Sequence, residues 1–424
     1  MLDKKILIAG GGISGITTAI EAAEAGFEII LIEKLPYLGG RVAGMNRYFP
    51  KLCPPSCGLE INFRRIKDNN RIMVFTSTEI KNFSGTKGNF NVELIRKPEF
   101  VNENCTVCGE CEKVCPAERP NDFNYNASKT KAIYLPHEMA FPYKYSIDEK
   151  YCLKQNCNKC LDVCKYDAID LSAKEKTFNI KATGIVFATG WKPYNASLIE
   201  NLGYDKYSDV ITNLMMERLA APNGPTNGNI LRPSDNTKPK TIAFVQCAGS
   251  RDEKHLPYCS AVCCSASLKQ AMYIIEQEPE TKIKIFYIDL RLSGRNEDFL
   301  NKIKEIRNIE LIKGKVGLIE QNFETKALIA SAEDIMSGKI IKEEFDMIVL
   351  ATGIQPETIN LKNIKCDEFG FIIPEFLEDG IFAASCTKKP LDVSASLKDA
   401  TGMALKAIQT VVGKKLPIIN PDKP

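Results

Sequence analysis

The N-terminal segment constrains the fold more than any other part of the chain. It reads "KKILIAGGGISGITTAIEAAEAGFEIILIEK", which predicts a buried strand, a glycine turn, an amphipathic helix and a second strand that ends in an acid. Gly10, Gly12 and Gly15 form G-x-G-x-x-G at the strand-to-helix turn, and Glu33 follows 18 residues after Gly15. The glycines allow close backbone approach to a pyrophosphate, the helix N-terminus stabilises its charge, and the acid accepts from ribose hydroxyls. We therefore expect a dinucleotide site that also includes Ser14 and Lys34.

The residues after the second strand indicate that the dinucleotide is FAD. "PYLGGRV" supplies Gly39, Gly40 and Arg41, as in FAD-dependent reductases with two dinucleotide-binding domains. Near the end of the chain, Ser385-Cys386 stands where a Gly-Asp pair commonly contacts FAD, so that contact is left open. Two more apolar strands end in small-residue turns, where such folds cross between lobes: Ala188, Thr189, Gly190 and Ala351, Thr352, Gly353. We expect an α/β, thioredoxin-reductase-like flavoprotein with both turns near the FAD.

The strand pattern divides the chain into segments. We expect an FAD domain over 1–97, an insertion over 98–172, and a return to the FAD domain over 173–235. A Pro/Gly/Asn-rich stretch at 221–240 is predicted to be the hinge between the lobes. Residues 236–354 are predicted to form a second Rossmann-like domain, and 355–424 the final part of the FAD domain.

The insertion is predicted to be a bacterial-ferredoxin-like domain with two [4Fe–4S] clusters. "CTVCGECEKVCP" has the spacing C-x2-C-x2-C-x3-C-P, and "CLKQNCNKCLDVC" repeats it with two extra residues in the first gap. In such repeats the fourth cysteine ligates the other cluster. Two structural zinc sites are the alternative, because thiolates also bind zinc. The expected ligands are Cys105, Cys108, Cys111 and Cys164 for one cluster, and Cys152, Cys157, Cys160 and Cys115 for the other.

A third group of cysteines replaces an expected nucleotide loop. "VQCAGSRDEKHLPYCSAVCCSASLKQA" (245–271) predicts a strand, a loop and a helix where a two-domain reductase would bind NAD(P)H, yet it lacks G-x-G-x-x-G. We therefore expect no pyridine-nucleotide site. Cys259 and Cys263 are four residues apart and are expected on one helical face, at an N-terminus that favours thiolate charge. We predict a third, non-standard [4Fe–4S] cluster held by Cys247, Cys259, Cys263 and Cys264; a dithiol pair or inert core thiols are the alternatives.

Several other residues have open roles. Cys53 and Cys57 follow the Gly-Gly-Arg turn and are either a redox-active or partner-facing pair or ordinary thiols of a Pro-stiffened loop. His137 is expected to be packed or at an interface, in preference to a role in proton transfer. With only two histidines in the chain, we do not expect a histidine-based metal site or a Ser-His-Asp hydrolase. The flavin itself is the expected redox centre, with no catalytic side chain.

Taken together, the FAD fingerprint, the eight-cysteine insertion and "QCAGSRD…YCSAVCC" resemble the HdrA family, the flavin-containing subunits of heterodisulfide reductase, over nearly the whole chain. This resemblance implies that Cys247, Cys259, Cys263 and Cys264 ligate a [4Fe–4S] cluster. "FPKLCPPSCGLEINFRRI" and "LPHEMAFPYKY" are similar to one branch, the QmoA proteins of quinone-interacting membrane-bound oxidoreductase complexes. The sequence is shorter than full HdrA, with no further ferredoxin domain after it, which argues against electron bifurcation.

The branch resemblance implies an electron-transfer subunit that links the menaquinone pool to adenylylsulfate (APS) reductase in dissimilatory sulfate reduction. Its implied partners are a membrane subunit with haem b and iron–sulfur clusters, and a second HdrA-like flavin/iron–sulfur subunit. The alternatives are an HdrA-like subunit of a heterodisulfide-reductase or sulfur-oxidation complex, with bifurcation included, and an assembly scaffold. A net charge of +3 gives no reason to expect nucleic acid. Without a leader or an apolar run of ~18 residues, we expect a cytoplasmic protein held at the inner membrane face by its partners.

Overall fold

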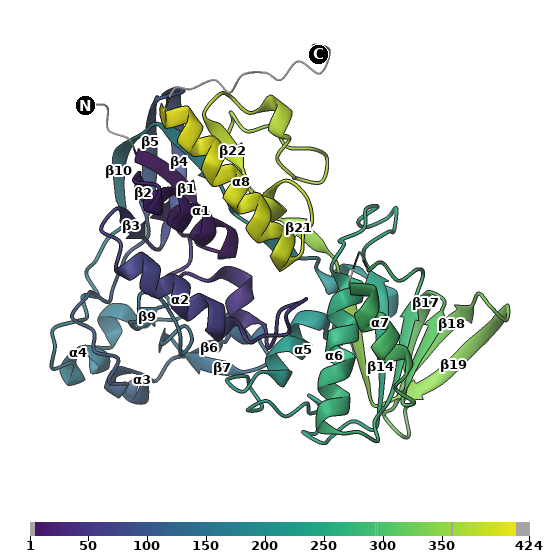
Figure 1. The fold of residues 1–424 in the computed structure, drawn as a ribbon. Coiled ribbons are helices and arrows are strands. Elements are labelled where there is room, and N and C mark those ends of the chain that lie inside the picture. Colours follow the sequence, from purple (N-terminus) through teal and green to yellow (C-terminus); the bar gives the residue numbers. More distant parts are fainter. Residues whose placement is uncertain (1–4, 293, 295, 358, 413–424) are drawn as a thin grey trace, which may run out of the picture.

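The chain forms two α/β lobes of the same plan (Figure 1). The computed structural model describes residues 5–292, 294, 296–357 and 359–412. Within these ranges each lobe contains a five-stranded parallel sheet and a three-stranded antiparallel meander. The predicted α/β architecture with parallel sheets is confirmed. Residues 413–424 of the predicted final FAD segment lie outside the described residues.

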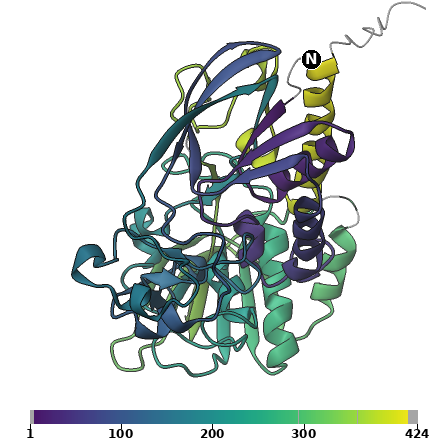
Figure 2. The ribbon, with the colours of Figure 1, turned by 90° about the vertical axis from the view of Figure 1, so that its left-hand side faces the viewer.

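The first lobe buries its parallel sheet between two layers. Alternate residues of its first strand face opposite ways: Ile6 and Ile8 pack against helices, while Leu7 and Ala9 pack against the meander. Figures 1 and 2 both show α8 beside α1, so the C-terminal helix returns to the N-terminal fingerprint. The sheet order is β22 (Ile381–Ala383), β11 (Gly184–Phe187), β1 (Lys5–Ala9), β2 (Glu28–Ile32), β3 (Ile72–Phe75); the helices are α1 (Ile13–Glu24), α2 (Pro55–Lys67) and α8 (Val393–Val412).

The insertion leaves and re-enters this lobe through one pair of strands. β5 (Asn89–Arg96) and β10 (Lys176–Ala182) are antiparallel neighbours, with Arg96 opposite Lys176, and β4 (Thr78–Thr86) completes the meander. The segment between them packs around its own small core, which includes Val101, Ile133 and Ile169. Its elements are α3 (Glu110–Val114), β6 (Glu118–Pro120), β7 (Lys129–Lys131), β8 (Ile133–Tyr134), β9 (Ser146–Ile147) and α4 (Lys159–Val163).

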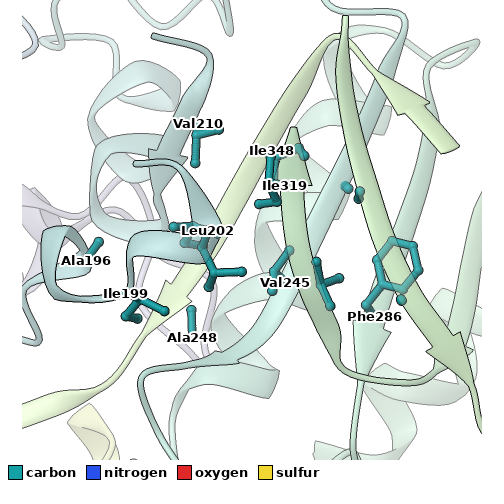
Figure 3. Close-up of a cluster of buried hydrophobic side chains, with 14 of the residues drawn as sticks. Ala196, Ile199, Leu202, Val210, Val245, Ala248, Phe286, Ile319 and Ile348 are labelled. Atoms are coloured by element: carbon teal, nitrogen blue, oxygen red, sulfur yellow. The ribbon is translucent and has the colours of Figure 1, made fainter. Parts of the chain in front are cut away.

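The second lobe repeats the plan of the first. Its sheet order is β13 (Val210–Thr212), β20 (Met347–Thr352), β14 (Thr241–Ala248), β15 (Lys282–Tyr287), β16 (Ile309–Lys313). The meander is β17 (Val316–Gln321), β18 (Leu328–Asp334), β19 (Lys339–Phe345), and the helices are α5 (Asn213–Ala220), α6 (Cys263–Gln277) and α7 (Asn296–Lys304). Figure 3 shows the apolar layer of this lobe, where Val245, Phe286, Ile319 and Ile348 meet. In both lobes, therefore, a central strand leads into a helix, β1 into α1 and β14 into α6.

The connection between the lobes differs from the prediction. β12 (Trp191–Pro193) and β21 (Ile354–Pro356) pair antiparallel and carry the chain between the lobes. We call them the hinge strands. The predicted hinge at 221–240 is wrong, because β13 and α5 precede it and already belong to the second lobe. None of the helices within the described ranges is both long and apolar enough to cross a bilayer.

Candidate functional site

A cavity of about 370 Å³ lies between the lobes, and we call it the interlobe cavity. It receives residues from both lobes, from the insertion and from the start of α8. Nine of the fifteen residues predicted for FAD line it: Gly12, Ser14, Glu33, Lys34, Gly40, Arg41, Ala188, Thr189 and Gly190. The others, Gly10, Gly15, Gly39, Ala351, Thr352 and Gly353, are not among its lining residues.

The first glycine turn fits a pyrophosphate. A Cβ on Gly15 would lie 1.8 Å from the Gly10 carbonyl oxygen, and one on Gly10 would lie 2.2 Å from the Ala188 oxygen, so these glycines permit close helix–sheet packing. Gly12 is different, because its nearest neighbour would be the Gly40 Cα at 3.8 Å and its open side faces the cavity. The bare backbone at Gly12 and the start of α1 therefore offer the close approach and the amide donors that a phosphate group requires.

Glu33 is positioned by backbone amides. Its Oε2 accepts from the Gly11 N–H at 2.6 Å and its Oε1 from the Leu35 N–H at 2.8 Å. Burial raises the pKa of this carboxyl, and the two amide bonds oppose that effect. Each carboxyl oxygen has a further lone pair, so Glu33 can still accept from the ribose hydroxyls of a dinucleotide.

An ion pair that the sequence did not predict lines the interlobe cavity on the side of the second lobe. The Lys269 ammonium of α6 lies 2.8 Å from Oε1 of Glu217 on α5, and both side chains are about 95% buried. Gln270 Nε2 donates to the same oxygen at 2.6 Å, and the backbone N–H of Asn46 donates to Oε2 at 3.0 Å. Tyr273 donates its hydroxyl to the Glu217 Oε2 at 3.4 Å. A buried, compensated ion pair thus lies beside the space available to a flavin.

The insertion contributes a stacked pair of rings, Phe123 and His137, at the edge of the interlobe cavity. Phe123, which lines the cavity, stacks on His137 at 4.8 Å between centroids and receives the Arg218 guanidinium over its ring at 4.5 Å. Arg218 is fully buried and donates to the Gly44 carbonyl oxygen and to the Asn124 side chain. Burial lowers the pKa of His137 to about 4, and the charge of Arg218 adds to this effect. His137 is packed, as predicted, and is neutral near pH 7.

The end of the first lobe completes the cavity. Cys386 lines it, as do Asp392 and Ser396 at the start of α8. Ser385 points elsewhere, because its hydroxyl donates to the Ser396 carbonyl oxygen at 2.9 Å. Of the pair that replaces Gly-Asp, only Cys386 therefore faces the space for a cofactor.

The two cysteine groups of the insertion line two separate small cavities. Cys105, Cys108, Cys111 and Cys164 line one, and Cys115, Cys152, Cys157 and Cys160 line the other. This is the crossed grouping that the ferredoxin spacing predicts. Burial raises the pKa of Cys111 to about 12 and that of Cys160 to about 11. Free thiols there would be neutral, so binding iron as thiolates would release protons.

The third cysteine set, Cys247, Cys259, Cys263 and Cys264, lies where β14 runs into α6. Burial raises the pKa of both Cys247, to about 11, and Cys263, and charge on the neighbouring cysteines raises each further. Backbone amides point at two of the sulfurs: Ala261 N–H donates to Cys259 Sγ at 3.4 Å and Arg291 N–H to Cys264 Sγ at 3.5 Å. Four sulfur donors with N–H···S bonds suit an iron–sulfur cluster.

One expectation for this set is wrong. α6 begins at Cys263, so Cys259 lies in the preceding loop and does not share a helical face with Cys263. The reason is local: Ala261 adopts a left-handed conformation with φ of 60°, which cannot belong to an α-helix. Cys259 therefore reaches the set from a loop, whereas Cys263 and Cys264 come from the first turn of α6.

The third set and the interlobe cavity are neighbours. Val262, Ser265 and Ala266, which flank Cys263 and Cys264 in the chain, line the cavity. The Cys263 sulfur lies 3.7 Å from the carbonyl oxygen of Thr352, so the predicted turn at 351–353 lies beside the third set and outside the cavity lining.

Other candidate residues lie away from the cavity lining. Cys53 is half-buried and Cys57 is exposed at the start of α2; their redox or partner role stays a prediction. Within the described ranges, no group of three or more His, Cys, Asp or Glu side chains is arranged to hold a single metal ion.

Comparisons with known proteins bear on the fold and on the cofactor. Residues 5–50 match the family model "FAD dependent oxidoreductase". The fold is similar to that of thioredoxin reductase from Lactococcus lactis, with a TM-score of 0.52 at 13% identity over 97% of this chain and 100% of that one. The thioredoxin-reductase-like fold is thus confirmed, and the family match supports FAD as the dinucleotide.

Two curated relatives are similar over nearly the whole chain. One is the HdrA protein of the H(2):CoB-CoM heterodisulfide,ferredoxin reductase of Methanothermobacter thermautotrophicus, 34% identical over 96% of this chain. The other is the HdrA-type iron-sulfur subunit of the CoB–CoM heterodisulfide reductase of Methanocaldococcus jannaschii, 36% identical over 95% of this chain. The chain spans 64% of the length of each.

Proposed function

We propose that this chain, whose homologues are HdrA proteins of heterodisulfide reductases, is an FAD- and iron–sulfur-containing electron-transfer subunit of a multisubunit complex. The homologues, the fold and the FAD family match support an oxidoreductase subunit. In its finer form the proposal assigns the chain to the QmoA branch. There it relays electrons between menaquinone and APS reductase in dissimilatory sulfate reduction.

One observation carries this proposal. In the first lobe, the connection from β1 to α1 presents a glycine turn to the interlobe cavity. In the second lobe, the equivalent connection from β14 to α6 carries four cysteines, and the residues beside them line the same cavity. A bound flavin can exchange two electrons at once or one at a time, and iron–sulfur clusters carry one each. The third cysteine set thus supports one-electron exchange where a nucleotide-dependent reductase would bind its hydride donor.

The chain's own residues have separable tasks in this function. Gly12 and the start of α1 bind the pyrophosphate, Glu33 binds the ribose, and the Lys269–Glu217 ion pair lies beside the flavin. The three cysteine groups hold three [4Fe–4S] clusters, two in the insertion and one at the start of α6.

The proposed partners are a membrane subunit with haem b and iron–sulfur clusters, and a second HdrA-like flavin/iron–sulfur subunit. Together they hold the chain at the inner face of the cytoplasmic membrane. The second candidate is an HdrA-like subunit of a heterodisulfide-reductase or sulfur-oxidation complex, with bifurcation included. The curated relatives favour it, because both are named as heterodisulfide reductase subunits.

The test is reduction of the purified native complex. We expect menaquinol to reduce the flavin, and NADH or NADPH to leave it oxidised on the same time scale. Copurification with APS reductase would support the finer form of the proposal. Rapid stoichiometric bleaching of the flavin by NADH would contradict it, and reduction by ferredoxin but not by menaquinol would favour the second candidate.

A variant of the third set tests the cysteine assignment. Cys263→Ser should lower the iron content by about one cluster's worth and leave FAD bound, because the glycine turn lies in the other lobe. Cys366→Ser is the matched control, since Cys366 packs among apolar residues of the first lobe. Unchanged iron in Cys263→Ser would return the set to ordinary thiols, and zinc in place of iron would favour structural zinc sites.

A further inference from the structure

The residues on either side of Cys259 bind one and the same residue of a hinge strand. Tyr258 donates its hydroxyl to the carbonyl oxygen of Ile354 at 2.9 Å, and the Ile354 N–H donates to the Ser260 hydroxyl at 2.9 Å. Ile354 is the first residue of β21 and lines the interlobe cavity. Cys259 is therefore fastened, through both chain neighbours, to a residue of the cavity wall.

The surroundings of this contact leave little freedom. Ser260 is buried and its hydroxyl lies 2.8 Å from that of Ser250. A Cβ on Gly353 would lie 2.3 Å from the Ser250 Oγ, so the loop approaches β21 closely only because glycine stands there. The Tyr258 ring packs edge-on against Phe371 of the first lobe, with centroids 5.4 Å apart.

A second contact fastens the same loop to the other hinge strand. Tyr194, which follows β12, places its hydroxyl 2.8 Å from Nδ1 of His255. Gly249 accommodates the Tyr194 ring, since a Cβ there would lie 2.6 Å from it. Loop 249–262 is thus held by residues at both strands that join the lobes.

Cys259 needs this fastening more than its companions do. Cys263 and Cys264 belong to the first turn of α6, and Cys247 lies in the buried strand β14, at a bulge where its own φ is 57°. Of these four cysteines, only Cys259 lies outside a helix or strand. Outer contacts of this kind orient metal ligands and tune the group that they hold.

We propose that Tyr258 and Ser260 are positioning residues that fix Cys259 to Ile354 and so hold the third cysteine set at a constant separation from the interlobe cavity. The inference rests on the proposed function, in which the flavin and a cluster at this set exchange electrons. It assigns a role to two residues that are not among those lining the interlobe cavity.

The experiment compares Tyr258→Phe, Ser260→Ala and the double variant with wild type in the intact complex. Tyr204→Phe is the matched control, because Tyr204 packs against the same apolar cluster but directs its hydroxyl to Met215. Hydrogen exchange of a peptide containing Ile354, measured on wild type and variants with and without cofactors, reports on the contact itself. Chelator resistance and the electron paramagnetic resonance spectrum of the third cluster report on the metal site.

We expect loss of the Ser260 hydroxyl to speed exchange of the Ile354 amide about tenfold, the usual effect of one hydrogen bond. Removal of iron from the third cluster by a chelator should become about tenfold easier in the double variant, with an altered spectrum and unchanged FAD content. Tyr204→Phe should match wild type in all three measurements.

Two results would overturn the inference. Exchange at Ile354 that is unchanged in the double variant would mean that the contact does not hold the loop. Faster exchange with an unaltered cluster would mean that the contact does not position Cys259. If wild type held no iron at the third set, the proposed function would fail at that site. The positioning role is tested separately: in cofactor-free protein, Ile354 exchange that is the same in the double variant as in wild type would overturn it.

Discussion

The Lys269 ammonium lies 2.8 Å from the Glu217 carboxylate on the wall of the interlobe cavity. Because both groups are buried, removing one leaves the other as an uncompensated charge. Lys269→Met should therefore lower the free energy of unfolding by roughly 3 kcal/mol, measured by denaturant titration of cofactor-free protein. The double variant Glu217→Gln/Lys269→Met should recover most of this loss. Lys284→Met, which breaks a more exposed pair with Glu343, should cost less than about 1 kcal/mol; an equal loss would contradict the argument.

Two glycines of the fingerprint should respond in opposite ways to alanine. Gly12 has φ of −75° and open space on its cavity side, so Gly12→Ala should fold normally yet bind FAD more than about tenfold more weakly. Gly15→Ala should unfold the first lobe, because the methyl group would meet the Gly10 carbonyl oxygen at 1.8 Å. Quenching of Trp191, the sole tryptophan and a cavity residue, measures FAD binding. Normal FAD affinity in Gly12→Ala would contradict this use of the turn.

The crossed cysteine grouping predicts which double variants lose one cluster and which lose two. Cys108 and Cys164 line the same cavity, so Cys108→Ser/Cys164→Ser should lose about as much iron as either single variant. Cys115 lines the other cavity, so Cys108→Ser/Cys115→Ser should lose about twice as much. Iron analysis per FAD checks both. The reverse pattern would mean that each sequence repeat holds its own cluster.

The buried His137 should make stability depend on pH. Its pKa is lowered from the ordinary 6.5 to about 4, so between these values the unfolded chain binds more protons than the folded one. The contribution is therefore fully present above about pH 6.5 and is lost as pH falls toward 4, by up to roughly 3 kcal/mol. His137→Phe retains a ring to stack on Phe123 and should flatten this slope in unfolding titrations between pH 4 and 7. His255→Gln serves as the control and should retain the slope.

The first lobe could be predicted from the sequence because its signals are local. The glycine turn and Glu33 lie within one strand–helix–strand unit, and the structure brings Gly12, Ser14 and Glu33 to one cavity. The grouping of the cysteines in the insertion could also be predicted, because the spacing of ligands within a short loop is a local property.

The rest depends on contacts between distant parts of the chain. Glu217 and Lys269 carry no motif, and their pairing follows only from the packing of α5 against α6. The position of Cys259 depends on the left-handed backbone of Ala261 and on the hydrogen bond between Ser260 and Ile354. The four-residue spacing between Cys259 and Cys263 reveals neither of them. The hinge was predicted in the wrong place because Pro and Gly mark any loop, whereas the crossing is defined by which sheet β13 joins.

The pairing of Arg96 with Lys176 means that the insertion begins and ends at adjacent backbone positions. The second lobe shows what an uninterrupted version looks like, because its equivalent strands, β18 and β19, are joined by a short turn from Ile335 to Gly338. A segment can therefore be inserted between β5 and β10 without a change in the register of these two strands. Replacing 97–175 with a turn of that kind would keep the register of the host strands, but it would also remove Phe123 and Asn124, which contact the buried Arg218.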